Sequence, residues 1–209
     1  MGSLPPLTRR ALGFALPFGL AVAAGVLVVL FVFGRGGSHT WSGTTFPDPQ
    51  PAAGLDGLLL DDGTPADLAA FEGKVVVVYF GYANCPDVCP LTLSRTADAV
   101  EGLGDRGDDV QVAMVSVDPA RDTLDLLGEY VRFFDERFVG VGGSEADLLE
   151  VAGQYGVFFQ ALPADDDGFY EVDHTATLLG IDRDGNLRVV WSPDIGADPL
   201  RDDLAELLS

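Results

Sequence analysis

Lysine is almost absent from this chain of 209 residues, in which Lys74 is the single example. Lys and Arg together number 12 against 33 Asp and Glu, and the formal net charge at pH 7 is −21. A surface of this charge repels nucleic-acid phosphates, which argues against a nucleic-acid partner, and it attracts cations or a basic protein face. Because an acidic surface also keeps proteins soluble, the charge alone identifies no ligand.

Several catalytic signatures are also missing. The sequence contains no Gly-rich phosphate-binding loop, no histidine pair of the zinc-protease type and no nucleophile elbow of the hydrolase type. Nucleotide-dependent, metalloprotease and serine-hydrolase functions therefore find no support in these patterns. Cysteine and histidine occur only twice each, so the candidates for thiol or metal chemistry are few.

One long apolar run does occur, over residues 11–33, between Arg10 and Arg35. A transmembrane helix needs about 20 apolar residues, whereas the apolar part of a cleaved signal peptide has about 7–15. We therefore predict an uncleaved, single-pass transmembrane anchor over residues 11–33. The arginines before the run outnumber the one after it, which predicts a cytoplasmic N-terminus over residues 1–10 and a soluble domain on the extracytoplasmic side of the cell membrane. No cysteine directly follows the run, which excludes a lipid-anchored lipoprotein.

Residues 34–53 are rich in Gly, Ser, Thr and Pro and show little periodicity. This composition predicts a flexible linker that becomes stiffer at its proline-rich end. We expect the globular domain to occupy residues 54–209, and we find no internal repeats.

The first half of that domain alternates two kinds of pattern. Continuous apolar runs over residues 74–82 and 110–118 are typical of buried strands. Helical patterns cover residues 88–103 and two later segments, for which Thr123 and Ser144 are the expected N-cap residues. The alternation predicts an α/β fold, a central sheet flanked by helices, with binding loops beyond the carboxyl ends of its strands.

The C-terminal part has the pattern of a hairpin and a closing helix. Residues 169–182 and 186–192 read as two strands joined by a turn at 183–185, and residues 198–208 read as a helix. The oxygens in this turn resemble the start of a calcium loop, but the glycine and the distal glutamate of that motif are missing. The sequence therefore predicts a plain hairpin turn.

Both cysteines, Cys85 and Cys89, lie in the segment YFGYANCPDVCPLTL, directly after the predicted strand 74–82. At a helix N-terminus the helix dipole and free amides lower the pKa of a thiol. Three interpretations follow: a structural disulfide, a redox pair, or two metal ligands. The structural disulfide is the weakest, because a bridge across so short a loop restrains little unfolded-state entropy. Outside the cytoplasm a bare thiol pair tends to oxidise, so it needs a reductant or a metal.

The two histidines differ in context. His39 lies in the predicted linker and is expected to be an ordinary solvated residue, whereas His174 heads an apolar strand. His174 is either a core or edge histidine bonded to a neighbour, or a third ligand beside the two thiolates, a set that suits Cu(I), Cu(II) or Zn(II). Asp173 either orients such a site, supplies an oxygen to it, or is solvated. Asp87 either tunes the charge of the thiolates, faces a partner, or is a solvated loop carboxylate.

Three segments, GKVVVVYFGYANCPDVCPLTL, VSVDPARDT and YEVDHTATLLGID, occur in this order and together strongly resemble the Sco family, also called SenC/PrrC. The resemblance covers residues 54–209. It implies a thioredoxin-like fold whose two cysteines are spaced C-x-x-x-C, following a membrane anchor. It also implies that copper is bound by Cys85, Cys89 and His174. Two departures, at Ala83–Asn84 and at Leu124, leave these three positions intact.

The resemblance further implies a function. Members of the Sco family are outward-facing copper proteins that help to assemble the binuclear copper centre of cytochrome c oxidase subunit II. We therefore predict a copper metallochaperone, not an enzyme in the strict sense, with subunit II as copper acceptor and an upstream copper donor or thiol reductant as further partner.

Two alternatives stay open. A membrane-anchored thiol-disulfide reductase of the same fold would keep the acceptor cysteines reduced through Cys85 and Cys89, but it has no evident use for His174. Thioredoxin-like reductases also favour the C-x-x-C spacing. A peroxidase of thioredoxin fold is weaker still, because the second cysteine lies so close to the first.

Overall fold

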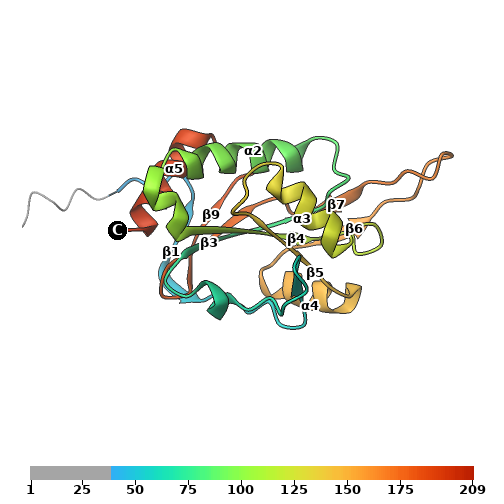
Figure 1. The fold of residues 1–209 in the computed structure, drawn as a ribbon, viewed down its shortest axis with the longest axis horizontal. Helices are drawn as coiled ribbons and strands as arrows, with labels where there is room; N and C mark the ends of the chain where they lie inside the picture. The colour runs from blue at the N-terminus through green and yellow to red at the C-terminus, as the bar shows by residue number, and fades with distance from the viewer. Residues whose placement is uncertain (1–38) are drawn as a thin grey trace, which may run out of the picture. The chain divides into compact units, whose positions relative to one another are not determined.

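The computed structural model describes residues 39–209 (Figure 1). Residues 41–209 form one compact unit. The predicted cytoplasmic N-terminus, the predicted anchor over residues 11–33 and the first part of the predicted linker lie outside the described residues. Within the described part of the chain, no helix combines the length and apolar character that a membrane span requires.

A seven-stranded mixed sheet forms the centre of this unit (Figure 1). Strands β3, β4 and β5 run parallel, and every other neighbouring pair is antiparallel. The order across the sheet is β1 (Thr44–Pro51), β9 (Asn186–Trp191), β8 (Leu178–Ile181), β3 (Val75–Gly81), β4 (Val110–Ser116), β5 (Val139–Gly142) and β2 (Leu59–Leu60).

Helices cover both faces of the sheet, which confirms the predicted α/β class. The chain passes from β3 through α2 to β4 and from β4 through α3 to β5, so both crossovers move the same way across the sheet. Because such connections are right-handed, α2 and α3 lie on the same face. Helix α5 packs against α2 on that face, and α4 and η1 lie on the other (Figure 1). The bounds are η1 (Leu68–Phe71), α2 (Val88–Glu101), η2 (Gly104–Asp109), α3 (Leu124–Arg132), α4 (Glu145–Gln154) and α5 (Ala197–Leu207).

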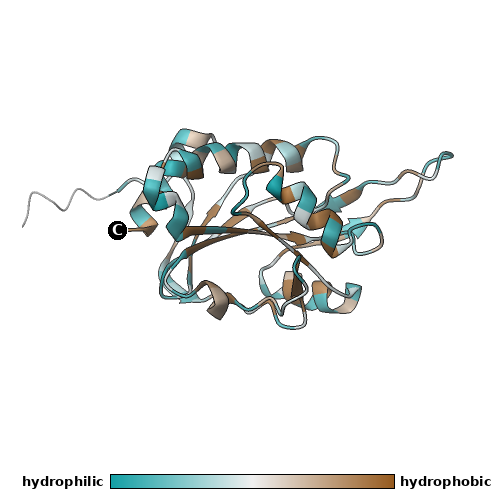
Figure 2. Cartoon of the chain, viewed as in Figure 1, coloured by the Kyte–Doolittle hydropathy of each residue, from teal (hydrophilic) through white to brown (hydrophobic). Residues whose placement is uncertain are grey.

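The local signals in the sequence explain these elements. All residues of β3 and β4 are buried, as expected for strands covered on both faces, and Figure 2 shows the central strands as the apolar layer between more polar helices. Thr123 caps α3 by accepting a hydrogen bond from the N–H of Leu126. Ser144 caps α4 by accepting one from the N–H of Asp147. Both N-cap predictions are confirmed.

The N-terminal edge of the sheet differs from the sequence prediction. Residues 34–53 were expected to form a linker, but Thr44–Pro51 is strand β1 and pairs with β9. The prolines that suggested a linker are tolerated because β1 is an edge strand, whose outer N–H groups need no partner. The domain therefore begins before residue 54.

A buried carboxylate fastens the chain just before β1. Asp203 of α5 is fully buried and accepts hydrogen bonds from the N–H groups of Ser42 and Gly43, at 3.0 and 3.1 Å. The same carboxylate accepts a bond from the indole N–H of Trp191 in β9, at 2.7 Å. Three donors thus meet one buried acceptor, which ties the start of β1 to the C-terminal helix.

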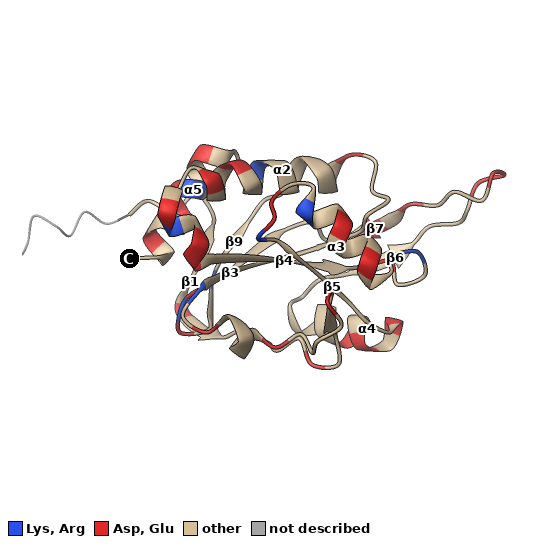
Figure 3. Cartoon of the chain, in the orientation of Figure 1, with Lys and Arg blue, Asp and Glu red and all other residues tan. Residues whose placement is uncertain are grey.

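The predicted strand over residues 169–182 is interrupted. Its second part is β8 in the central sheet, whereas its first part is β7 (Val172–His174), which pairs with β6 (Phe159–Ala161) in a separate two-stranded sheet. β8 pairs with β3 only from Leu178 onward, where Leu178 lies opposite Tyr79. Residues 172–177 therefore have no strand partner in the central sheet. We call residues 159–174 the His hairpin. It extends beyond the central sheet in Figure 1, and its tip carries acidic residues (Figure 3).

Candidate metal centre

Residues 82–87, here called the Cys loop, connect the end of β3 to the start of α2. Cys85 lies in this loop and Cys89 in the first turn of α2, so both follow the carboxyl end of a central strand, as predicted. Both thiols are free. Cys89 is fully buried and Cys85 is 9% exposed, so Cys85 is the more exposed of the two cysteines.

The two sulfurs have opposite acid strengths. The pKa of Cys85 is lowered to about 3, first because the Cys89 side chain hydrogen-bonds to it, and further by His174 and the backbone N–H groups of Asp87 and Cys89. The pKa of Cys89 is raised, because its proton is held in the bond to Cys85 and because it is buried. Without metal, the pair therefore carries one thiolate, on Cys85, at neutral pH.

His174 is the last residue of β7 and brings its ring to the cysteines. Its Nε2 lies 3.6 Å from the sulfur of Cys89. The rings of Tyr79 and Tyr82 stand edge-on to the imidazole, with centroids 6.5 and 5.7 Å away. Within the described residues, the Nδ1 atom of His174 is buried and has no hydrogen-bond partner. A buried nitrogen without a partner is costly unless another group fills its place.

The three side chains are spaced for one metal ion. Each of Cys85, Cys89 and His174 offers one ligand atom, and these three atoms lie within 4.8 Å of one another. An ion bonded to sulfur and nitrogen at roughly 2.0–2.3 Å needs its ligands at about this spacing. Two thiolates and an imidazole are the donor set of a soft or borderline ion. The residues therefore fit a copper or zinc ion, and the structure brings together all three of the predicted ligands.

A cavity of about 300 Å³ opens onto this cluster. Its rim carries three exposed carboxylates, of Asp87, Glu171 and Asp173. Neither Asp87 nor Asp173 belongs to the group of ligand-spaced atoms. Asp173 therefore supplies no oxygen to this group, and the exposed carboxylates that line the cavity make it acidic.

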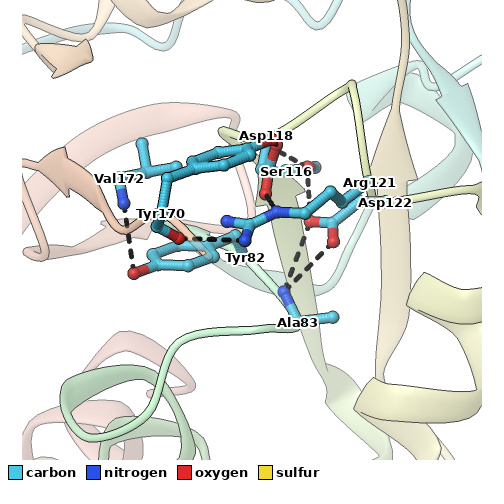
Figure 4. Close-up of polar contacts among 8 residues, drawn as sticks. All are labelled: Tyr82, Ala83, Ser116, Asp118, Arg121, Asp122, Tyr170 and Val172. Atoms are coloured by element: carbon cyan, nitrogen blue, oxygen red, sulfur yellow. Dashed lines mark hydrogen bonds and ion pairs between the residues drawn. The ribbon is translucent and has the colours of Figure 1, made fainter. Parts of the chain in front are cut away.

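Residues of the segment VSVDPARDT surround the site, and no local pattern in the sequence predicts a role for them there. Figure 4 shows that the Asp122 carboxylate accepts hydrogen bonds from the N–H of Ala83, at 3.3 Å, and from the hydroxyl of Ser116, at 2.7 Å. Burial raises the pKa of Asp122 to about 6. This carboxylate ties the Cys loop to the end of β4. The signal that could have identified it is an Asp and a Ser at the end of a strand that is otherwise apolar.

Comparisons with known proteins agree with this geometry. A family model described as SCO1/SenC matches residues 57–209. An SCO2-like protein of Rickettsia prowazekii is 33% identical over 127 residues, which are 60% of this chain and 62% of that protein. The matched part thus spans less than two thirds of that relative's length.

Solved structures show the same fold. Apo Sco1 from Thermus thermophilus superimposes with a TM-score of 0.73 at 37% identity, over 83% of this chain and 100% of that one. ScoI from Bradyrhizobium japonicum with copper bound superimposes with a TM-score of 0.66 at 30% identity, over 79% of this chain and 99% of that one. The central mixed sheet flanked by helices is therefore the thioredoxin-like fold of these proteins.

Proposed function

Because this chain belongs to the SCO1/SenC family, we propose that it is a copper-binding assembly factor for cytochrome c oxidase. Cys85, Cys89 and His174 hold one copper ion, which is delivered to the binuclear copper centre of subunit II. The observation that carries the proposal is the meeting of these three ligand atoms, which lie within 4.8 Å of one another although they come from three different segments.

Copper is favoured over zinc by two considerations. Two thiolates and one imidazole suit Cu(I) and Cu(II) as well as Zn(II), and only three protein ligands are gathered among the described residues, whereas structural zinc sites are usually closed by four. ScoI of Bradyrhizobium japonicum, which has this fold, is known with copper bound.

The exposure of the ligands supports delivery by ligand exchange. Cys89 is fully buried, whereas Cys85 and His174 border the cavity. Ligands of an acceptor can therefore replace Cys85 and His174 first, while Cys89 still holds the ion. The acidic rim attracts a cation as the site is loaded. With the predicted anchor over residues 11–33, this exchange takes place at the extracytoplasmic face of the membrane.

A thiol-disulfide reductase is the second candidate, and the low pKa of Cys85 favours it. A sulfur that is ionised at neutral pH and not fully buried is a competent nucleophile. His174 assists that reaction only by helping to lower the pKa of Cys85, whereas copper binding uses its ring nitrogen as a third ligand beside both sulfurs, which leaves copper binding as the leading proposal.

Copper titration of the reduced full chain tests both candidates. We expect copper–thiolate absorption bands and, for Cu(II), an electron paramagnetic resonance spectrum with nitrogen coupling. His174→Ala, Cys85→Ser and Cys89→Ser should each lower copper affinity by at least about 100-fold, since even outer-shell changes cost about 10–100-fold. His39→Ala is the matched control and should bind as the unaltered protein does.

Two results would contradict the proposal. Full copper affinity in His174→Ala removes the three-ligand site. Absence of copper binding together with rapid reduction of insulin disulfides, abolished in Cys85→Ser, identifies the reductase instead.

A further inference from the structure

The position of His174 depends on contacts outside the central sheet. Its strand β7 pairs only with β6, and His174 lies opposite Phe159 in that pairing. The hydrogen bonds of the central sheet begin again at Leu178. The pairing within the His hairpin therefore orders the hairpin itself but does not fix its distance from the Cys loop. Side chains that join the His hairpin to the Cys loop must therefore fix that distance.

One such group is formed by Asp118, Arg121 and Tyr170, which we call the Arg121 cluster (Figure 4). The guanidinium of Arg121 lies over the ring of Tyr170, with its carbon 3.6 Å from the ring centroid. Its Nη1 donates to the backbone carbonyl of Tyr170 at 2.9 Å, and its Nε donates to the carboxylate of Asp118. The hydroxyl of Tyr170 donates to the same carboxylate at 2.8 Å. Arg121 thus holds both the backbone and the ring of a residue in the His hairpin.

A second connection runs from the Cys loop to the same strand. The hydroxyl of Tyr82 accepts a hydrogen bond from the backbone N–H of Val172, at 3.2 Å. Tyr82 begins the Cys loop, and Val172 begins β7 two residues before His174. The Arg121 guanidinium also lies 5.8 Å from the centroid of the Tyr82 ring. The Cys loop, the segment after β4 and the His hairpin therefore meet around one arginine.

Burial makes this cluster act as a unit. The side chain of Asp118 is 3% exposed and that of Arg121 is 22% exposed. A buried charge that loses its partner is strongly destabilising, whereas in the complete group the Asp118 carboxylate is paired with the guanidinium of Arg121. Removal of the arginine therefore leaves the Asp118 carboxylate paired only with neutral donors and releases the backbone of Tyr170. The His hairpin then loses two of the contacts that join it to the segment after β4.

We propose that Arg121 is a positioning residue of the metal centre, which acts with Asp118 and Tyr170 to hold His174 within bonding distance of the ion that Cys85 and Cys89 bind. The inference rests on the proposed copper site. It assigns a role to the segment VSVDPARDT, none of whose residues contributes a ligand atom to the cluster.

The test compares Arg121→Met with Arg183→Met in the full chain. Arg183 is the matched control, because it pairs with Asp109 at 2.8 Å on the exposed surface. In the metal-free protein, the N–H of Val172 should exchange with solvent at least about tenfold faster in Arg121→Met, while that of Val78 in β3 stays unchanged. Arg183→Met should alter neither of these two exchange rates. This readout does not require copper.

The copper-loaded protein gives the second readout. Arg121→Met should still bind copper through the two cysteines but should lose the nitrogen coupling in its paramagnetic resonance spectrum. Its affinity should fall to within about threefold of that of His174→Ala, and the variant carrying both changes should bind no more weakly than His174→Ala alone. Such non-additivity marks two residues that act through one interaction.

The outcomes separate the two proposals. If the unaltered protein shows no copper signal that depends on His174, the proposed function fails. If it shows that signal and folded Arg121→Met keeps it, the positioning role alone is wrong. Should Arg121→Met not fold, Arg121→Lys serves instead, because lysine keeps the positive charge beside Asp118 but lacks the planar guanidinium that lies over the Tyr170 ring and bonds its carbonyl. Unchanged exchange at Val172 and an unchanged copper spectrum in that variant overturn the proposal.

Discussion

The backbone N–H of Cys89 donates a hydrogen bond to the sulfur of Cys85, across 3.4 Å. The side chain of Cys89 adds a second bond to the same sulfur, and these bonds, with those from His174 and the N–H of Asp87, lower the pKa of Cys85 to about 3. The first turn of α2 thus keeps a thiolate ready for a metal ion, and it does so on the more exposed of the two sulfurs.

Alkylation of the reduced, metal-free protein should therefore separate the two cysteines. We expect iodoacetamide to modify Cys85 at a rate that stays nearly constant between pH 5 and pH 8, because the thiolate is fully formed throughout. Cys89 should stay unmodified, since it is buried and protonated. Peptide mass spectrometry identifies the modified residue, and Cys85→Ser is the control that should show no modification at pH 5. A Cys85 rate that falls about tenfold for each pH unit below 8 would contradict the assignment.

The buried carboxylate of Asp122 predicts a pH-dependent stability. Its pKa is raised from 3.8 to about 6, so the folded state binds a proton more tightly than the unfolded state does. The stabilisation from this group is therefore fully present below about pH 4 and is lost as the pH rises through about 6. We therefore expect the free energy of unfolding of the wild type to fall by up to about 3 kcal/mol, relative to that of Asp122→Asn, between pH 4 and pH 7. Urea unfolding at several pH values measures this difference. A difference that does not change with pH would contradict this.

Gly81 provides a test of packing beneath the metal centre. A Cβ atom at this position would lie 2.6 Å from the Tyr79 ring and 3.2 Å from the sulfur of Cys89. Gly81→Ala should therefore lower the free energy of unfolding by about 1–3 kcal/mol and weaken copper binding, because a ligand must move. Gly153→Ala in α4 is the control, since a Cβ there meets no atom within 4 Å. It should be neutral or stabilising by up to about 1 kcal/mol. Equal behaviour of the two variants in thermal unfolding and copper titration would count against this reading.

Asp203 should be among the most sensitive carboxylates for stability. Asp203→Ala leaves the indole N–H of Trp191 and the N–H groups of Ser42 and Gly43 without this acceptor. We expect the free energy of unfolding to fall by about 3 kcal/mol or more, at roughly 1–3 kcal/mol for each buried donor left unpaired. Asp202→Ala removes an exposed partner of Arg201 and should change stability by less than about 0.5 kcal/mol. A loss below 1 kcal/mol in Asp203→Ala would show that β1 contributes little to the domain.

Local sequence patterns predicted most of the elements. The apolar run over residues 74–82 became β3, and Thr123 and Ser144 cap the helices that they were expected to cap. These features depend on neighbours within a few residues, which a single sequence contains. The proposed copper ligands were less local, because Cys89 and His174 are separated by 85 positions. The residue types offered His174 as a third ligand only as one of two alternatives, and the combination of motifs that resembles the Sco family favoured that alternative before the structure did.

Two features could not be predicted because they depend on distant partners. The break between His174 and Leu178 depends on where pairing with β3 ends. The apolar sequence of the segment does not indicate that position. The Arg121 cluster depends on contacts across 49 and 52 positions of the chain. An arginine in a loop is ordinarily solvated, so its sequence context gives no warning that it lies over a tyrosine ring.

The prolines of β1 have one more consequence, for self-association. Pro47, Pro49 and Pro51 lack the N–H groups with which a second chain would extend the sheet. At the opposite edge, β2 is only two residues long. A sheet of seven strands would otherwise present two edges on which a second molecule could add strands, and here one edge is chemically blocked and the other is too short. The composition that resembles a linker thus protects the protein against edge-to-edge aggregation.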